Sequence, residues 1–417
     1  MHHDTSVLIV GGGTFGLSTA YRLAKAGYKH ITVLEQSPSI PSDSSAGHDL
    51  NKIIRAEYED PFYTYLALQA IQEWKTPLFA PYFHQTGYLL ANSSNAPEKA
   101  KLTLQRSLAS ISSHPSFKDQ IQPINTRDDI RAVAPAFDGP MSWTGYFNRF
   151  AGYAHAANAL RTLYTVCRSL GVSFRLSDAA ASLLFSDNNP TNACIGIRTR
   201  SGAHLHANRT ILTLGASTAT ILPQITPQIT AKAWSVGHVQ LTPSEAAHLR
   251  GIPVTYARDL GFFFEPDPAT HLLKVCPSGA GYTNFIREGV SVPPEEGGSN
   301  WIPREDEERI RALLRETLPA LAERPVVDKK LCWCADAADT EYVIDFVPGM
   351  ENLVVVTGDS GHGFKMLPVV GEWVREVLER GRQDVARWRW KERGKGDEEV
   401  SWRVGKTTDL SSLGPDR

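Results

Sequence analysis

A glycine-rich loop between a short apolar strand and a helix constrains this chain more than any other feature. Residues 6–10 form an apolar run of strand length, Gly11-x-Gly13-x-x-Gly16 follows at once, and residues 17–26 carry apolar side chains at helical spacing. A second apolar run, residues 30–34, ends at Glu35. This order predicts a right-handed parallel strand, helix, strand unit, which opens an α/β nucleotide-binding domain.

The chemistry of such a loop favours a dinucleotide. One glycine makes the tight turn, one lets the backbone approach a pyrophosphate and one packs the helix on the strand, so the phosphates meet the free N–H groups of the helix N-terminus. An acidic residue at the position of Glu35 accepts hydrogen bonds from ribose hydroxyls and disfavours NADP. The loop alone leaves FAD, NAD and a turn without a ligand as alternatives.

Composition narrows the class of partner. The chain has 417 residues, enough for two or three domains, and 42% hydrophobic with 21% charged residues is ordinary for a globular protein. Its formal charge is −2, without the basic excess of a protein that binds nucleic acid or a membrane surface. We therefore expect neither partner, and we find no apolar run long enough for a membrane helix.

The cysteines and the chain ends bear on location. Five cysteines are an odd and sparse set for this length, so we expect no disulfide framework and a reducing compartment. The first residues do not resemble a secretory leader, and the last three, Pro415-Asp-Arg417, are not a Ser-Lys-Leu type of address. We expect a cytoplasmic protein, with the peroxisome as the alternative.

Periodicity along the rest of the chain predicts two domains. The expected helices cover residues 58–75, 154–170, 304–318 and the stretch that ends at Leu378, and the expected strands cover 172–176, 209–214 and 353–356. Alternation within residues 230–290 predicts a largely antiparallel sheet. We assign residues 1–84, 150–224 and 330–417 to the nucleotide domain and residues 85–149 and 225–329 to a substrate domain. Trp388, Trp390 and Trp402 are candidate anchors of the charged tail.

Further segments decide between the cofactors. Residues 44–55 (SSAGHDLNKIIR), 232–243 (KAWSVGHVQLTP), 332–339 (CWCADAAD) and 358–365 (GDSGHGFK) resemble the fructosyl amino acid oxidases, or amadoriases. These belong, with monomeric sarcosine oxidase, to the D-amino-acid-oxidase-like flavoproteins. The resemblance spans nearly the whole chain. It implies FAD, a monomer, and an α/β fold of the glutathione-reductase type, in which a Rossmann-like FAD-binding domain carries a largely antiparallel β-sheet substrate domain.

The resemblance also implies a covalent flavin. In this family a cysteine thioether holds the 8α-carbon of the ring, and Cys332 occupies the matching position, where a thiolate near positive charge is needed. The alternatives for Cys332 and Cys334 are two buried structural cysteines or half of a metal site, although the chain has no second pair at ligand spacing and we expect no metal. The expected FAD contacts are Gly11, Gly13, Thr14, Phe15, Gly16, Glu35, Gln36, Ser45, Ala46, Gly47, Lys52, Gly215, Ala216, Cys332, Asp359, Gly361, His362, Gly363, Phe364 and Lys365.

Basic residues take the catalytic positions that the resemblance implies. Lys274 matches the lysine that activates oxygen, because a cation beside the flavin stabilises superoxide character; the alternative is a lysine on an exposed strand face. Lys365 matches a lysine that binds the substrate carboxylate, and Lys52 and Arg55 match a pair of basic residues near it. The resemblance gives Arg403 a carboxylate contact as well.

Some of these assignments have simpler alternatives. The alternative for Arg55 is a surface cation of a helix. Isolated histidines are more often hydrogen-bonded scaffolding than general bases, so we expect no catalytic role for His48 or His362.

Departures from the amadoriase pattern concern the substrate. Typical amadoriases have aspartate and glutamate shortly after the oxygen lysine, and the glutamate holds sugar hydroxyls, whereas this chain has Pro277-Ser278. The asparagine after the Ala-Gly turn is replaced by His48. Loss of the acid removes an acceptor for a polyol, so we expect fructosyl adducts to be poor substrates and a less hydroxylated N-alkyl amino acid to be preferred.

These observations lead to one expected function and several alternatives. We expect oxidation of the secondary amine of an N-substituted amino acid to an imine, with O2 reduced to H2O2. The alternatives are a biosynthetic oxidase that makes an iminium from an N-methyl aromatic amino acid, a sarcosine, pipecolate or saccharopine oxidase, a dehydrogenase that passes electrons to a partner, and a flavin-binding protein without catalysis.

Overall fold

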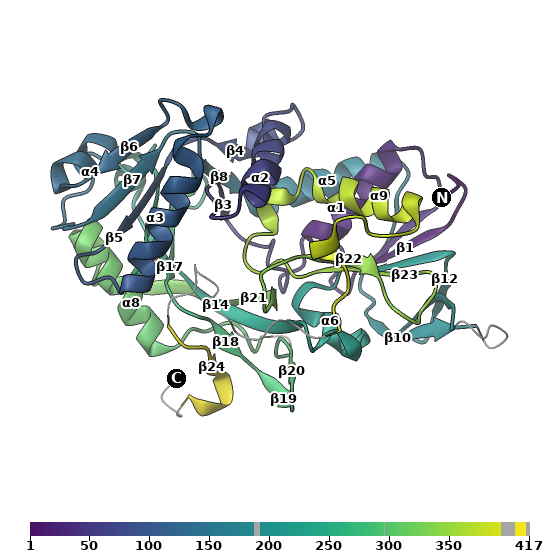
Figure 1. Ribbon diagram of the computed structural model, residues 1–417. Helices are drawn as coiled ribbons and strands as arrows, with labels where there is room; N and C mark the ends of the chain where they lie inside the picture. The colour runs from purple at the N-terminus through teal and green to yellow at the C-terminus, as the bar shows by residue number, and fades with distance from the viewer. Residues whose placement is uncertain (187–191, 296, 393–404, 414–417) are drawn as a thin grey trace.

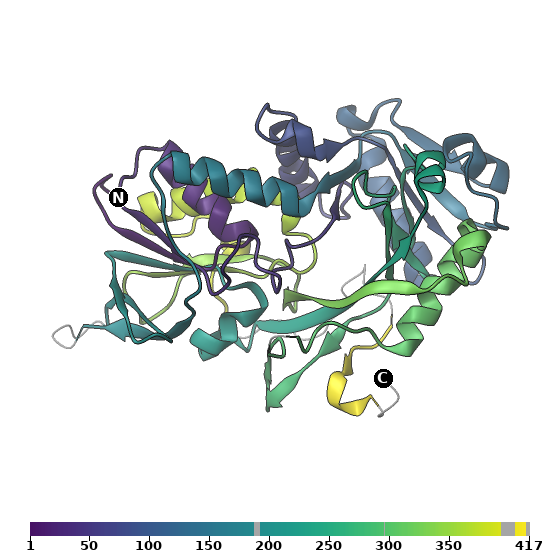
Figure 2. The same cartoon turned by 180° about the vertical axis from the view of Figure 1, so that it is seen from behind.

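The computed structural model describes residues 1–186, 192–295, 297–392 and 405–413. Arg403 and Trp402 lie outside the described residues. Figure 1 shows two lobes: β1 and α1, which flank the glycine loop, lie in one, and the other holds β5, β6 and β7. Figure 2 shows from behind how the long strand β14 runs beneath both lobes.

A mixed sheet, six-stranded within the described residues, forms the first lobe. Its strands are parallel except β22, and β1 pairs β2 in the register Val7↔Ile31, which confirms the expected parallel unit. Four consecutive buried residues make up β1, as expected for a strand covered on both faces. In spatial order the strands are β22 (Val343–Phe346), β23 (Leu353–Thr357), β13 (Arg209–Leu212), β1 (Val7–Val10), β2 (Ile31–Leu34) and β9 (Ser173–Arg175).

The second lobe is built on a larger sheet, ten-stranded in the described part of the chain. It is antiparallel except for the pairs β15 with β5 and β18 with β24, so the expected largely antiparallel sheet is confirmed. Its strands are β24 (Thr408–Asp409), β18 (Tyr282–Thr283), β14 (Ile229–Gln240), β17 (Leu272–Pro277), β16 (Gly261–Phe263), β15 (Val254–Ala257), β5 (Tyr88–Asn92), β7 (Thr144–Asn148) and β6 (Ile121–Ile124), with β21 (Val326–Ala337) paired to β14.

Helices and small sheets complete the two lobes. α1, α5 and α9 pack together on the six-stranded sheet. The helices are α1 (Thr14–Lys25), α2 (Pro61–Trp74), α3 (Glu98–Ser112), α4 (Arg127–Val133), α5 (Ala156–Ser169), α6 (Thr218–Ile221), α7 (Pro243–His248), α8 (Arg304–Thr317) and α9 (Val370–Arg380). The small sheets hold β3 (Asn51–Ile54), β8 (Gly152–His155) and β4 (Phe83–His84); β10 (Ala180–Phe185), β11 (Cys194–Thr199) and β12 (His204–His206); and β19 (Phe285–Arg287) and β20 (Val290–Ser291).

Two expected helix starts are wrong. The helix expected from Ala154 begins at Ala156, because Gly152–His155 pair as β8 with β3, a long-range pairing that local periodicity does not reveal. The helix expected after Gly363 begins only at Val370, after a 3-10 turn over Phe364–Met366. No helix of the described residues is long and apolar enough to span a membrane.

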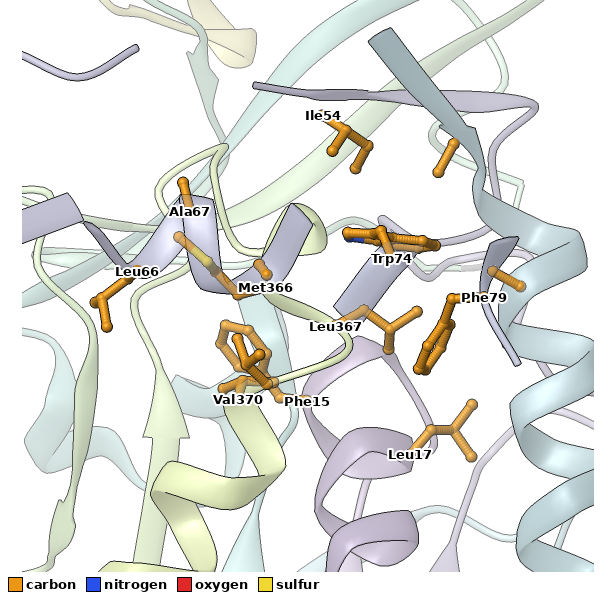
Figure 3. Close-up of a cluster of buried hydrophobic side chains, with 14 of the residues drawn as sticks. Phe15, Leu17, Ile54, Leu66, Ala67, Trp74, Phe79, Met366, Leu367 and Val370 are labelled. Carbon is orange, nitrogen blue, oxygen red and sulfur yellow. The ribbon is translucent and has the colours of Figure 1, made fainter. Parts of the chain in front are cut away.

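The hydrophobic core divides along the two faces of the ten-stranded sheet. Leu89, Phe147 and Leu273 belong to a cluster on one face, whereas their strand neighbours Tyr88 and Tyr146 join the large cluster around α1 and α2. Figure 3 shows part of that large cluster, in which Phe15 and Leu17 of α1 lie near Trp74 of α2 and Leu367. One face of the ten-stranded sheet is therefore turned toward the first lobe.

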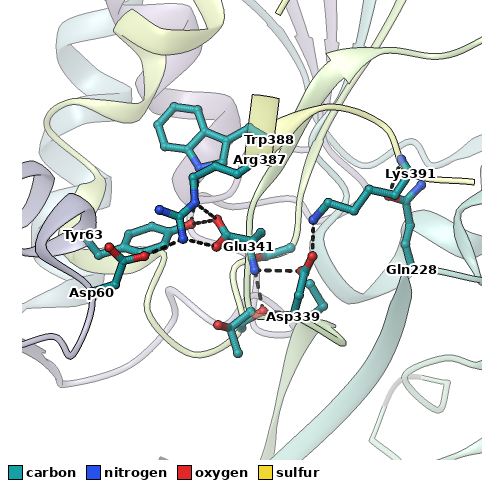
Figure 4. Close-up of polar contacts among 12 residues, drawn as sticks. Asp60, Tyr63, Gln228, Asp339, Glu341, Arg387, Trp388 and Lys391 are labelled. Carbon is teal, nitrogen blue, oxygen red and sulfur yellow. Dashed lines mark hydrogen bonds and ion pairs between the residues drawn. The ribbon is translucent and has the colours of Figure 1, made fainter. Parts of the chain in front are cut away.

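The start of the C-terminal tail is fixed to the first lobe. Figure 4 shows Arg387 reaching both Asp60 and Glu341, with its Nε 3.0 Å from Glu341 Oε2. Trp388 is buried, and its indole N–H donates to the Tyr63 hydroxyl at 3.3 Å. Trp390 is partly buried against a third cluster. The expected anchoring is confirmed for these two tryptophans, while Trp402 lies beyond the part that is described.

Candidate active site

The glycine loop forms a cradle at the carboxyl end of β1 and the start of α1. Gly11 has φ +110°, and a Cβ there would lie 2.5 Å from the Thr213 carbonyl oxygen. A Cβ on Gly16 would lie 1.9 Å from the Gly11 oxygen, so only glycine allows this approach of helix and strand. The N-terminus of α1 has no side-chain cap from any described residue. Its free N–H groups fit a pyrophosphate, which is what a dinucleotide brings.

Glu35 ends β2 beside this cradle. Its Oε2 accepts from the Gly12 backbone N–H at 2.8 Å and its Oε1 from the Ser37 N–H at 3.1 Å. Burial raises the pKa of Glu35, while these backbone hydrogen bonds oppose the rise. The carboxylate is thus fixed where the ribose of a bound dinucleotide would be recognised.

The expected contact residues in other segments lie close to the same loop. A Cβ on Gly47 would come within 3.2 Å of Thr14 Oγ1, and the Gly47 N–H donates to Ser45 Oγ at 3.1 Å. A Cβ on Gly363 would lie 2.9 Å from the Phe15 ring. The structure therefore brings the turns at 44–47 and 358–363 to the N-terminal end of α1.

Two titratable side chains in the 358–363 turn differ in role. Asp359 accepts from the Ala335 N–H at 2.8 Å, and burial raises the pKa of Asp359 to about 6. His362 is hydrogen-bonded on both ring nitrogens, to the Tyr342 hydroxyl at 3.0 Å and the Thr340 carbonyl at 2.9 Å. Burial lowers the pKa of His362 to about 3, so the ring is neutral scaffolding near pH 7.

A buried carboxylate holds two lysines together at the start of β3. Asp49 Oδ2 lies 2.5 Å from the Lys274 Nζ and 2.9 Å from the Lys52 Nζ. Lys274 also donates to the Asn51 carbonyl at 2.8 Å and is 2% exposed, which excludes the alternative of a lysine on an exposed face. Burial opposes ionisation of Asp49, but the two ammonium groups hold the pKa of Asp49 well below its ordinary value.

Cys332 lies beside this group. The Lys52 Nζ is 3.6 Å from the Cys332 sulfur, and the neighbouring Cys334 thiol and the Lys52 ammonium together lower the pKa of Cys332 well below its ordinary value against the effect of burial. Cys334, in contrast, has a raised pKa. Cys332 is therefore the more acidic thiol of the pair. It and Lys274 lie on strands that both pair with β14, opposite Trp234 and His238.

A second cationic group forms where β3 ends. The Arg55 guanidinium lies 5.0 Å and the Lys365 ammonium 5.3 Å from the centre of the Tyr58 ring. Burial and the charge of Arg55 lower the pKa of Lys365 well below its ordinary value. Arg55 follows a strand, so the alternative of a helix-surface cation is wrong. Lys52 contacts Asp49 and Cys332 instead of joining this pair.

Several polar residues of this region were missed by the sequence analysis. Asp49 gave no signal, because its partner Lys274 is 225 positions away in the chain. The Asn51 amide is buried, and neither its nitrogen nor its oxygen has a hydrogen-bond partner among the described residues. Such an orphaned amide beside Lys52 fits a site that a polar ring system completes. The described residues contain no cluster of three or more His, Cys, Asp or Glu side chains that could hold a metal.

The parallel sheet with its phosphate cradle, facing an antiparallel sheet that carries Lys274, defines the class of flavin-dependent oxidoreductases. The chain belongs to the DAO family of FAD dependent oxidoreductases, whose model matches residues 6–377. FAD dependence and the expected fold class are thus confirmed.

Particular relatives agree with this assignment. L-saccharopine oxidase of Schizosaccharomyces pombe is 31% identical over 421 residues, which cover 95% of each chain. Amadoriase II of Aspergillus fumigatus superposes with a TM-score of 0.89 at 33% identity, covering 99% of this chain and 97% of that one. A modified fructosyl peptide oxidase of Aspergillus nidulans superposes with a TM-score of 0.91 at 33% identity over 100% of both chains. The resemblance to the amadoriase group is confirmed.

Proposed function

We propose that this chain is an FAD-dependent oxidase that converts the secondary amine of an N-substituted amino acid into an imine and releases H2O2. The observation that carries the proposal is the meeting of Arg55 and Lys365 over one tyrosine ring. Neither cation is paired with a carboxylate of the described residues. A substrate carboxylate completes the pair, and bidentate binding by a guanidinium fixes its orientation.

Each group then has a separate task. When bound, FAD accepts the two electrons and the hydrogen from the carbon next to the amine nitrogen and returns the electrons to O2. Arg55 and Lys365 hold the carboxylate so that this carbon is presented in one orientation. A bound carboxylate favours the ammonium form of Lys365, against the burial that lowers its pKa. Lys274, held in place by Asp49, stabilises negative charge that develops on oxygen.

The position after Lys274 supports a substrate that is not a sugar adduct. Pro277 is the last residue of β17, the strand that carries Lys274, and Ser278 comes directly after it. Neither side chain offers a carboxylate to sugar hydroxyls. One relative of similar length is a saccharopine oxidase, while the similar solved structures are amadoriases and fructosyl peptide oxidases. We therefore place this chain among oxidases of N-alkyl amino acids.

Flavin bleaching under anaerobic conditions tests the function. Purified enzyme is mixed with fructosyl-glycine, fructosyl-lysine, sarcosine, N-methyl aromatic amino acids, pipecolate and L-saccharopine, and peroxide is then measured in air. We expect at least one N-alkyl amino acid to reduce the flavin and to yield peroxide faster than the fructosyl compounds do. Turnover of the fructosyl compounds alone would contradict the substrate class, and reduction without peroxide would indicate a dehydrogenase.

We also propose that Cys332 tethers the cofactor through a thioether to the 8α-carbon. Formation of this bond would remove the proton of the Cys332 thiol and one hydrogen of the methyl group whose carbon is the 8α-carbon. The two electrons and two protons released would convert O2 into H2O2. The lowered pKa of Cys332 and its contact with Lys52 support this choice over Cys334.

Acid precipitation checks the tether. We expect the wild-type pellet and the Cys334→Ala pellet to stay yellow and the Cys332→Ala pellet to be colourless, because only the thiolate attacks. A colourless Cys334→Ala pellet beside a yellow Cys332→Ala pellet would show that the assignment is reversed.

The proposal also includes the oligomeric state, the cellular location and the domain boundaries of the chain. The chain acts as a monomer, which size-exclusion chromatography with light scattering tests, and it resides in the cytoplasm. The division into an FAD domain and a substrate domain stays a prediction, with its last boundary, between residues 329 and 330, inside β21.

A further inference from the structure

Arg258 is a buried cation without a partner. It follows β15, and its backbone N–H donates to the Ala91 carbonyl at 2.9 Å, so it continues the pairing of β15 with β5 by one residue. Only 5% of the residue is exposed. Its Nε and Nη2 atoms are buried and have no hydrogen-bond partner among the described residues, and it forms no ion pair there. A buried unpaired guanidinium is costly, which indicates that something outside the chain neutralises it.

Sheet register puts Arg258 on the same face of the ten-stranded sheet as two buried tyrosines. Tyr88 and Tyr146 lie on the neighbouring strands β5 and β7, on the face of the sheet that joins the core around α1 and α2. The Tyr146 hydroxyl is buried and also has no partner. Burial raises the pKa of both tyrosines, while the charges of Arg55 and Arg258 oppose the rise in each. Ala257 lies in the cluster on the opposite face of the sheet, so the side chain of the next residue, Arg258, alternates onto the face that carries these tyrosines.

A direct contact joins this face to the end of β3. Asn148, opposite Tyr88 in the sheet, donates from its amide to Glu57 Oε1 at 2.6 Å, and Glu57 is two residues beyond Arg55. The other oxygen of Glu57 accepts from the Ala56 N–H at 3.0 Å. Glu57 is fully buried, and none of the basic side chains forms an ion pair with it.

The charges of this cluster do not balance. The cluster holds three basic side chains, Arg55, Arg258 and Lys365, against one carboxyl group, Glu57, among the described residues. Two carboxylates from a ligand would neutralise the remainder. A substrate with a single carboxylate would pair with Arg55 and Lys365 and leave Arg258 unpaired. A sugar or an apolar group on the amine nitrogen would not neutralise Arg258 either.

We propose that Arg258 binds a second carboxylate, carried by the substituent on the amine nitrogen, and that the substrate is an N-(carboxyalkyl) amino acid. The inference rests on the proposed function, in which Arg55 and Lys365 hold the carboxylate of the amino acid itself. Tyr146 supplies a hydroxyl donor to the same second carboxylate, which would satisfy its buried oxygen.

Matched substrates test the second site. Each N-alkyl amino acid is used in two forms, with the end of the alkyl group either a carboxylate or the neutral amide, over a range of spacer lengths. We expect the wild type to prefer the acid form at one spacer length by at least about tenfold in kcat/KM, as for a hydrogen bond to a charged group. Arg258→Met reduces this acid-to-amide ratio by about tenfold or more, and Arg258→Lys restores part of it.

Thermal unfolding without substrate separates binding from a structural role. Because Arg258→Met removes an unpaired buried charge, its Tm is expected to equal or exceed that of the wild type; Arg198→Met, on the exposed face of β11, is the control. A lowered Tm for Arg258→Met with equal losses on acid and amide overturns the proposal, as does a wild type without preference for the acid. If no N-substituted amino acid of either form reduces the flavin, the proposed function itself is wrong.

Discussion

Replacement of Lys274 by methionine is expected to slow reoxidation of the reduced enzyme by O2 by about 10²- to 10³-fold, the usual effect of removing one preorganised charge from a transition state. The residue is 2% exposed, and its ammonium group is fixed by Asp49 at 2.5 Å and by the Asn51 carbonyl at 2.8 Å. Stopped-flow mixing of anaerobically reduced enzyme with oxygenated buffer measures the rate constant directly.

The control is a second buried lysine of the same sheet. Lys232 lies on β14 and pairs with Asp336 at 3.0 Å. We expect Lys232→Met to slow reoxidation much less than Lys274→Met. Flavin reduction by substrate is measured in the same preparations, because the oxygen assignment requires that Lys274→Met slows reoxidation far more than reduction. An equal loss in both half-reactions would show instead that Lys274 serves substrate binding or folding.

Replacement of Asp49 by asparagine is expected to lower the free energy of unfolding by about 3–5 kcal/mol, as when one partner of a buried ion pair is removed. The asparagine keeps the shape of the side chain but leaves Lys274 and Lys52 as two buried positive charges next to each other. Chemical denaturation at neutral pH measures the change. Asp43→Asn is the matched control in the same loop, because its side chain is 89% exposed and its ion pair within the described residues is with His48 at 3.5 Å.

The effect of Asp49→Asn has a defined pH dependence. The folded pKa of Asp49 is lowered by the two lysines, although burial opposes this, so the carboxylate stabilises the fold above its unfolded pKa of about 4. This contribution is lost as the pH falls toward the folded pKa. The difference between the wild type and Asp49→Asn should therefore shrink in acid. A difference that is constant from pH 7 to pH 3 would mean that shape, and not charge, makes Asp49 important.

Local patterns were sufficient to predict the start of the first lobe. The strand at 6–10, the glycine loop and the helix that follows each have a pattern of their own, so the parallel unit follows from about thirty consecutive residues, whereas the choice of FAD came from the family resemblance. Cys332 and Lys365 were found because they lie in long segments with a family resemblance. Their immediate surroundings, such as the contact of Lys52 with Cys332, required the fold.

Long-range pairing explains what the sequence did not reveal. Asp49 is one acidic residue in a polar loop until β17 brings Lys274 to it. Arg258 looks like an ordinary turn residue in the sequence, and its burial follows only from the pairing of β15 with β5, which lies more than 160 residues earlier. The strand Gly152–His155 was taken into the following helix because its partner, β3, is a hundred residues earlier. Sheet register is set by such distant partners and not by local propensity.

The ladder centred on β14 has an evolutionary consequence. Lys274 and Cys332 are both registered against this one strand, so their separation is inherited with the backbone and does not depend on the loops that select a substrate. Arg258 lies outside the ladder, in the turn between β15 and β16. With the roles proposed above, substitutions in this turn would change the substrate that is accepted while the positions of Lys274 and Cys332 stay the same.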